Sequence, residues 1–447
     1  MTGKEIVYNL DSQKTEDIFS SLYGADGVES ARQRYRRLIE ELLDDSEFPR
    51  QEFPQAGRDL RIFSVPGRTE LGGNHTDHNR CKVLAASIQL DAVAVVAPRQ
   101  DKQIFFRSVG HSDVRVDLTD LSVREEEKGN AASLIRGIAA EFAARGTPVG
   151  GFTANADNMV LTGSGLSSSA AVEVLIGKIF DNLYCGGRRS ALELAQIGQK
   201  AENVYFGKPC GLMDQTACAS GGAVAIDFED LQNPKVKGIG FDTTSTDYTL
   251  CVIDTKGTHS DLTPDYAAIP TEMKAIAAFF GKTVLRELDE ETLVKSLPEL
   301  RAAVGDRAIV RAFHFFNENR LVDAMLAALE KMHALPLSGK GMAMEVFLAL
   351  VRESGDSSWE LLQNVFSTKN PGEQGVSLAL ALTKRFLKSH DGNGACRVHG
   401  GGFAGTIQAY IALDDLQDYR ELMEKIFGKG ALTVLRIRPL GAIELEF

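Results

Sequence analysis

A chain of 447 residues is long enough for two or three domains of about 150 residues, each with a substantial core. Apolar residues make up 44% of it and charged residues 25%, which is typical of a globular protein and excludes a disordered or fibrous chain. The formal net charge of −12 predicts a surface that repels nucleic acids and anionic membranes, so we expect neither as a partner.

The sequence also argues against a membrane or secreted location. No apolar run approaches the roughly 20 residues that a membrane-spanning helix needs, and the first residues lack the basic and apolar segments of a secretory signal. The six cysteines are scattered without a C-x-x-C pair, which indicates reduced thiols rather than a disulfide framework or a zinc site. We therefore expect a soluble cytoplasmic enzyme.

In the first half, a polar extension is followed by alternating strands and helices. Residues 1–58 are rich in charge and are expected to pack on the body as an N-terminal extension, with one helix over 30–43. From residue 59, short β-branched runs between glycines predict strands over 60–65, 83–87, 91–97, 103–107, 152–161 and 223–228. Apolar spacing predicts helices over 131–145, 168–183 and 190–205.

The second half is mostly helical between its first and last strands. Strands are predicted over 248–254, 406–413, 431–436 and 443–447, and helices over 271–280, 290–297, 308–333, 341–353 and 376–389. Short strands with segregated helices predict an α+β (mixed α/β) fold. We place the domains at residues 59–235 and 236–447.

The strongest chemical signal is the segment LTGSGLSSSAA at residues 161–171, between a predicted strand and a predicted helix. Glycines allow the backbone to approach a ligand closely, and the free N–H groups at a helix start favour an anion. Serine hydroxyls can also bind Mg²⁺. The segment predicts a phosphate-binding loop rather than an ordinary capped turn.

Two further glycine-rich segments carry weaker signals. Residues 66–79 (PGRTELGGNHTDHN) place arginine, asparagine, histidine and aspartate among glycines after a strand, which suits the hydroxyl groups of a polyol. Residues 397–406 (RVHGGGFAGT) lead into a strand, and their three successive glycines indicate either close backbone packing or a flexible hinge.

Other nucleotide and metal motifs fail on spacing. The Gly-Lys-Thr at 281–283 is not a P-loop, because Ile276 stands where the first glycine is needed. The H-x-D-H at 75–78 lacks the additional upstream ligand of a dinuclear hydrolase, because Gly73 occupies that position. A dinucleotide fingerprint is also absent, since Ser168 replaces its third glycine.

Together, the three glycine-rich segments resemble in order the signature motifs of the GHMP small-molecule kinases, and among these the galactokinase family. Residues 66–79 are similar to the signature Gly-Arg-x-Asn-Leu-Ile-Gly-Glu-His-Thr-Asp-Tyr-Asn, and residues 201–203 with 209–215 resemble the catalytic-aspartate segment. Residues 259–260 and 265–266 resemble the sugar-binding tyrosine region. The similarity extends from about residue 61 to residue 442.

The resemblance implies a two-domain GHMP kinase fold whose interdomain cleft holds ATP and a sugar, and whose activity phosphorylates the C1 hydroxyl of galactose. It assigns Asp214 as the proton acceptor and Arg68 as the residue that stabilises charge during transfer. It assigns Mg²⁺ to Ser169 and Glu202. The phosphates would bind Gly163, Ser164, Gly165, Leu166, Ser167, Ser168 and Ser169. The sugar would contact Asn74, His75, Asp77, Gly211 and Tyr266.

Two departures from the signature keep alternatives open. Asn74 replaces the family's Glu and Glu70 replaces its Asn, so we hypothesise altered tolerance at the sugar's C6, for example toward galacturonate or arabinose. A second alternative is a non-catalytic sugar sensor, which the complete serine-rich segment with Arg68 and Asp214 disfavours. We expect a monomer or a weak homo-oligomer.

Overall fold

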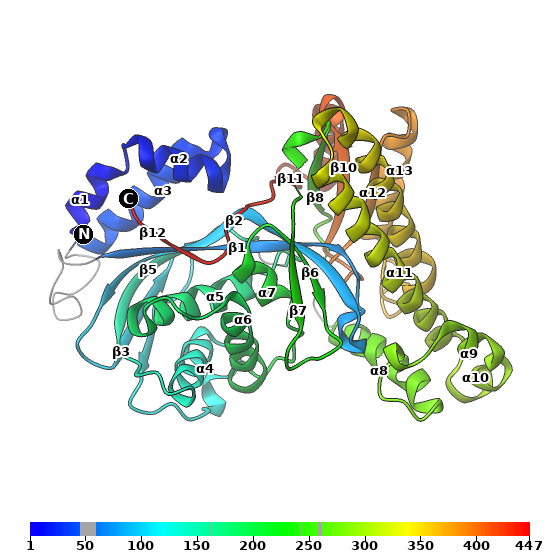
Figure 1. The fold of residues 1–447 in the computed structure, drawn as a ribbon, viewed down its shortest axis with the longest axis horizontal. Coiled ribbons are helices and arrows are strands. Elements are labelled where there is room, and N and C mark those ends of the chain that lie inside the picture. The colour runs from blue at the N-terminus through cyan, green and yellow to red at the C-terminus, as the bar shows by residue number, and fades with distance from the viewer. Residues whose placement is uncertain (45–59, 162, 242, 258–261) are drawn as a thin grey trace.

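Two β-sheets, one of eight strands and one of four, organise the described part of the chain (Figure 1). The computed structural model describes residues 1–44, 60–161, 163–241, 243–257 and 262–447. Helices pack against both sheets, so the predicted mixed α/β class is confirmed. Within these described ranges, no helix is long and apolar enough to cross a membrane.

The eight-stranded sheet is built on the long antiparallel pair β1 (Arg61–Gly72) and β2 (Lys82–Pro98). The strand order is β12-β1-β2-β5-β3-β4, and β6 and β7 extend the sheet from the first half of β2. The other strands are β3 (Gln103–Ser108), β4 (Val114–Asp117), β5 (Phe152–Asn158), β6 (Ala223–Asp227), β7 (Lys235–Ile239) and β12 (Ile443–Leu445). The strands predicted over 83–87 and 91–97 are therefore one continuous strand.

Helices cover both faces of this sheet, α4 to α7 on one side and α1 to α3 on the other (Figure 1). Their bounds are α1 (Gly3–Asn9), α2 (Gln13–Tyr23), α3 (Val28–Leu43), α4 (Ala131–Ala144), α5 (Ser168–Phe180), α6 (Ala191–Lys200) and α7 (Met213–Ser220). The predicted helix over 30–43 is confirmed as α3, and the described part of the extension does pack on the body. Residues 45–58 of the predicted extension lie outside the described residues.

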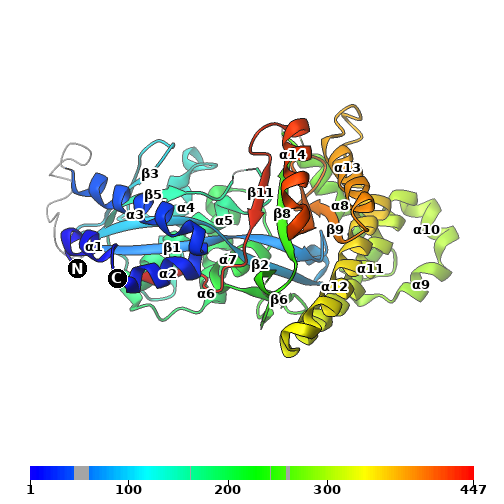
Figure 2. The same cartoon turned by 90° about the horizontal axis from the view of Figure 1, so that it is seen from above.

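The four-stranded sheet has the order β11-β8-β10-β9 and is antiparallel throughout. It consists of β8 (Tyr248–Asp254), β9 (Gly394–His399), β10 (Thr406–Ala412) and β11 (Leu432–Leu435). Around it lie α8 (Thr263–Phe279), α9 (Glu290–Lys295), α10 (Leu297–Val304), α11 (Asp306–Ala334), α12 (Leu337–Ser357), α13 (Gly375–Ser389) and α14 (Leu416–Phe427). Figure 2 shows α9 and α10 at the end of the molecule opposite α1.

The strands do not separate at the predicted boundary between residues 235 and 236. β7 begins at Lys235 and crosses it, and β12 returns to the first sheet, where Ile443 pairs with Ser64 of β1. A buried ion cluster joins the same regions, because Asp91 accepts hydrogen bonds from Arg34 of α3 and from Arg438. The division into domains at 59–235 and 236–447 remains a prediction.

Candidate active site

The predicted catalytic pair, Arg68 and Asp214, is in direct contact. Arg68 lies on β1 and donates from Nε to Asp214 Oδ1 at 2.9 Å and from Nη2 to Oδ2 at 2.7 Å. Asp214 is the second residue of α7, near the helix start, where a carboxylate is stabilised by the helix dipole. The guanidinium is 7% exposed but the carboxylate is 35% exposed, so one member of the pair is accessible to a ligand.

The electrostatic environment keeps Asp214 ionised. Burial alone would raise the pKa of this carboxyl group, but the Arg68 guanidinium and the Ser167 hydroxyl outweigh burial and place the pKa below its ordinary value. Ser167 donates from Oγ to Asp214 Oδ2. A carboxylate that is ionised and partly exposed can accept a proton or a hydrogen bond from a substrate hydroxyl.

The serine-rich segment forms the turn that leads into α5. Gly163, Gly165 and Ser167 have φ values of +74°, +71° and +62°, a left-handed conformation that glycine adopts without strain and that serine rarely does. Arg68 donates through its side chain to the carbonyl of Gly165 and through its backbone N–H to that of Leu166 at 3.0 Å. The turn is thus fixed beside the pair of Arg68 and Asp214. Thr162 of this segment lies outside the described residues.

Strands of the second sheet fix the turn from the other side. Thr406 Oγ1 donates to the carbonyl of Ser164 at 2.8 Å, and His399 Nδ1 lies 3.2 Å from the same oxygen. His399 Nε2 lies 3.0 Å from Thr69 Oγ1 on β1, so one ring connects the turn to the strand of Arg68. Burial, together with the nearby Arg68 and Arg397, lowers the pKa of His399 to about 3, so the ring is neutral.

The segment that holds the predicted sugar residues begins within β1 rather than as a loop. Residues up to Gly72 remain paired with β2, with register shifts after Pro66 and Glu70. Such bulges re-aim side chains next to active sites. The strand predicted over 60–65 therefore continues to residue 72 and includes the first half of the polar segment 66–79. The residues that follow, 73–81, form the loop, which we call the sugar loop.

A buried carboxylate and a buried imidazole of α11 hold the backbone of the sugar loop. Glu318 Oε2 accepts from the N–H groups of Gly73 at 3.0 Å and Asn74 at 3.3 Å. His314 Nε2 lies 2.9 Å from the carbonyl oxygen of Asn74, to which the neutral ring donates. His314 Nδ1 accepts from Ser357 Oγ at 2.8 Å. Neither side chain of α11 was identified from the sequence.

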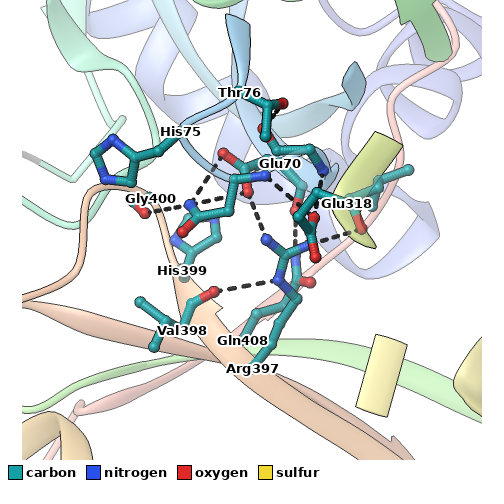
Figure 3. A network of polar contacts seen from close by, with 12 residues as sticks. Glu70, His75, Thr76, Glu318, Arg397, Val398, His399, Gly400 and Gln408 are labelled. Atoms are coloured by element: carbon teal, nitrogen blue, oxygen red, sulfur yellow. Dashed lines mark hydrogen bonds and ion pairs between the residues drawn. The ribbon is translucent and has the colours of Figure 1, made fainter. Parts of the chain in front are cut away.

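The side chain of Asn74 is also bonded within the protein. Its amide nitrogen donates to the carbonyl of Gly400 at 2.7 Å and to Glu70 Oε1 at 3.2 Å, and its Oδ1 accepts from Asn364 Nδ2 at 2.9 Å. Figure 3 shows the network from Glu70 and the sugar loop to β9 and β10. Asn74 is 1% exposed, so its side chain holds neighbouring segments together from inside the protein.

Glu70, the second departure from the signature, forms an ion pair with Arg397 of β9 (Figure 3). The Oε1 to Nη2 distance is 2.6 Å, and the two side chains are 5% and 1% exposed. Burial raises the pKa of Glu70, although Arg397 and Arg68 oppose that rise. Gln408 of β10 donates to the backbone carbonyl of Glu70 at 2.9 Å. Glu70 and Asn74, which replace the Asn and Glu of the family signature, thus contact each other, and the carboxylate lies on β1.

The three successive glycines pack closely against the predicted sugar residues. His75 Nε2 lies 2.8 Å from the carbonyl oxygen of Gly401, and Tyr266 donates to that of Gly402 at 3.0 Å. A Cβ atom on Gly401 would lie 2.5 Å from the Tyr266 ring. Of the two interpretations of this segment, the structure supports close backbone packing rather than a hinge.

The remaining predicted sugar residues, Asp77 and Gly211, also meet. A Cβ atom on Gly211 would lie 2.2 Å from Asp77 Oδ2, so glycine is required for this approach. Gly211 precedes α7 by two residues, which brings the sugar loop next to the start of the helix of Asp214. Residues 259–260, which also resemble the family motif, lie outside the described residues.

The predicted metal residues border a pair of buried carboxylates. Glu202 is 3% exposed, and Gln215 Nε2 donates both to Glu202 Oε2 at 3.1 Å and to Glu173 Oε2 at 2.9 Å. Glu173 follows Ser169 by four residues on α5, so both side chains lie on one face of that helix. In the described chain, no group of three or more His, Cys, Asp or Glu side chains could hold a metal by itself. One carboxylate and one hydroxyl nevertheless fit Mg²⁺, which binds few protein ligands and shares substrate phosphates.

Comparisons with known proteins identify the relatives of this chain. Residues 50–98 match the galactokinase galactose-binding signature, and residues 133–222 match the N-terminal domain of GHMP kinases. A galactokinase of Streptomyces coelicolor is 30% identical over 382 residues, which cover 84% of this chain and 91% of that protein. A galactokinase of Glaesserella parasuis is 30% identical over 382 residues, which cover 82% of this chain and 88% of the relative.

Solved structures share the fold at lower identity. The crystal structure of Lactococcus lactis galactokinase complexed with galactose has a TM-score of 0.71 and 23% identity, covering 87% of this chain and 96% of that one. Methanococcus jannaschii mevalonate kinase has a TM-score of 0.58 and 13% identity, covering 85% and 99%. The extent of the sequence similarity and the match to the galactose-binding signature together show that the chain belongs to the galactokinase family of GHMP kinases.

Proposed function

We propose that this enzyme transfers the γ-phosphoryl group of ATP to the C1 hydroxyl of galactose and releases galactose 1-phosphate and ADP. The observation that carries the proposal is the bidentate pair of Arg68 and Asp214 beside the serine-rich turn. Membership in the galactokinase family and the signature over residues 50–98 support the same activity.

In the proposed reaction, Asp214 orients the C1 hydroxyl and accepts its proton as the oxygen attacks the γ-phosphorus. The new O–P bond forms while the bond between the γ-phosphorus and the ADP oxygen breaks. Arg68 keeps Asp214 ionised and offsets the negative charge of the transferred group. The turn at residues 163–169 holds the phosphates through its backbone N–H groups and the start of α5.

Ser169 and Glu202 are the proposed residues that hold Mg²⁺. When bound, this ion would offset the negative charge of the phosphates. Gln215 keeps the Glu202 carboxylate in place from the buried side.

His75, Asp77, Gly211 and Tyr266 are proposed to contact the sugar, and the buried Asn74 is proposed to hold the sugar loop behind them. Burial lowers the pKa of His75 to about 4, so its ring is neutral and can donate or accept one hydrogen bond at each nitrogen. The similarity to galactokinases favours galactose over a sugar altered at C6, and favours a kinase over a non-catalytic sensor.

We also propose that the active site lies between the predicted domains at 59–235 and 236–447. Residues of β1 and α7 from the first, and of α8 and the 400–402 segment from the second, would face the substrates. All of these residues come from one chain, which is compatible with a monomer or a weak homo-oligomer. Use of ATP suits the expected cytoplasmic location.

Coupled measurement of ADP release with ATP, Mg²⁺ and galactose tests the proposal, and mass spectrometry of the sugar product identifies the phosphorylated position. We expect rapid release with galactose and slower release with galacturonate and arabinose. Absence of galactose-dependent ADP release, or faster turnover of a C6-altered sugar, would overturn the assignment.

A further inference from the structure

The carboxylate of Glu202 has a cationic partner within the chain. Glu202 Oε1 lies 3.2 Å from Lys208 Nζ, and Oε2 accepts from Gln215. Among the ion pairs of the described residues, Lys208 is the basic group that reaches Glu202. The oxygen of Glu202 that Gln215 leaves free is therefore occupied by an ammonium group.

A backbone turn places Lys208 next to the helical turn that contains Glu202. Residues 201–206 form a π-helical turn, and Gly207 follows it with a φ of +83°. The N–H groups of Gly207 and Lys208 both donate to the carbonyl of Glu202, at 3.0 Å and 3.1 Å. This fixed turn sets the start of the Lys208 side chain within reach of the carboxylate.

The two members of the pair differ in exposure. The Lys208 side chain is 63% exposed, whereas that of Glu202 is 4% exposed. The ammonium thus lies between solvent and a buried carboxylate, and its flexible stem can move away while the backbone turn stays in place. Glu202, held by Gln215, cannot follow it.

A second buried carboxyl group, that of Glu173, lies close to Glu202. Glu173 is fully buried, and Gln215 bridges it to Glu202 by donating one hydrogen bond to each carboxyl group. Among the described residues, Glu173 Oε1 has no hydrogen-bond partner. Burial and the neighbouring Glu202 raise the pKa of Glu173 well above its ordinary value. The higher pKa favours the neutral form of Glu173, so Glu202 is the carboxylate that Lys208 neutralises.

We propose that Lys208 is a tethered cation that pairs with Glu202 and must withdraw before a divalent cation binds there. The inference rests on the proposed function, because it takes Glu202 as a metal ligand. Competition between the ammonium and the ion then raises the metal concentration that the enzyme requires.

The test is a Mn²⁺ titration of protein saturated with ADP, with free Mn²⁺ measured by electron paramagnetic resonance. Lys208→Met should lower the half-saturating Mn²⁺ concentration about three- to tenfold, because it removes one neighbouring positive charge. Lys200→Met is the matched control: Lys200 is 56% exposed and pairs at 2.7 Å with the buried Glu141, and it should leave the titration unchanged.

An unchanged or higher Mn²⁺ requirement in Lys208→Met would overturn the proposal. If Lys208 instead contacts the phosphates, the variant will bind ADP more weakly in EDTA, which also contradicts competition for Glu202. Glu202→Gln separates the assumptions: a wild-type Mn²⁺ titration in that variant refutes the metal site, and with it the role of Lys208. ADP release with galactose tests the proposed function independently.

Discussion

Replacing Gly401 with alanine should disturb sugar binding through a single side chain. An added Cβ atom would lie 2.5 Å from Tyr266 Cε1, and ordinary contact begins at 3.4 Å, so the ring must retreat by about 0.9 Å. The ring cannot turn aside freely, because its hydroxyl donates to Gly402 at 3.0 Å and Phe403 packs edge-on at 5.5 Å. The backbone of Gly401 is not left-handed, so the effect is steric.

A displacement of about 1 Å in a positioning group can reduce catalysis on the order of 100-fold. We therefore expect Gly401→Ala to raise KM for galactose about 10- to 100-fold, with KM for ATP within about twofold because the serine-rich turn is untouched. Initial rates of ADP release with each substrate varied in turn measure both constants. Gly341→Ala is the control, since a Cβ atom there meets nothing within 4 Å.

The effects of Gly401→Ala and Tyr266→Ala on galactose KM should not add. In a Tyr266→Ala background the added methyl group has no ring to displace, so Gly401→Ala should then change KM for galactose little. A wild-type galactose KM in the single variant would refute the steric argument. If Gly401→Ala raises KM for galactose as much in the double variant, its effect does not depend on the Tyr266 ring.

Three further variants test the rest of the account. Asp214→Asn should lower kcat by about 10² to 10⁴ while thermal unfolding shows an intact fold; near-normal turnover would exclude its role as proton acceptor. Glu318→Ala leaves two buried N–H groups of the sugar loop unpaired, so we expect a loss of about 1–3 kcal/mol in unfolding free energy and a raised KM for galactose but not for ATP. Asp91→Asn removes the buried carboxylate that Arg34 and Arg438 share; Arg34 keeps Asp157 but Arg438 loses its ion pair, which should cost about 3–5 kcal/mol at pH 7 in denaturant unfolding. Burial raises the pKa of Asp91, but both arginines and Ser64 outweigh burial, so the net pKa shift is downward. The stabilisation by Asp91 is therefore present above about pH 4 and is lost as the pH falls further. A stability advantage of the wild type over Asp91→Asn that grows on acidification would contradict this.

Local patterns predicted most of the elements, and the family resemblance indicated Arg68 and Asp214, which the structure places in contact. Strand β8 and helices α4 and α13 match their predicted ranges within a residue or two, because their apolar spacing is regular. Some short elements were not predicted: α7, which carries Asp214, has only eight residues, and its apolar residues are mostly small. Helix α1 was missed although Thr2 and Glu5 form a capping box, a signal that the sequence does contain.

The supports of the site could not be predicted in the same way. Glu318 and His314 lie about 240 residues from the sugar loop, and polar residues on a long helix resemble a solvated face until the fold buries them. The pairing of Glu70 with Arg397 likewise depends on how β1 meets β9, which no local pattern specifies. Gln215, in contrast, directly follows Asp214 in the recognised segment, so that motif could have drawn attention to it.

A crystal structure with galactose and a non-hydrolysable ATP analogue would test most directly whether the Arg68 and Asp214 pair performs the transfer. The account predicts the C1 oxygen within about 2.6–3.2 Å of an Asp214 carboxylate oxygen, with the γ-phosphate beside Arg68 and the 163–169 turn. A sugar whose C1 oxygen points away from Asp214, or a γ-phosphate bound elsewhere, would contradict it.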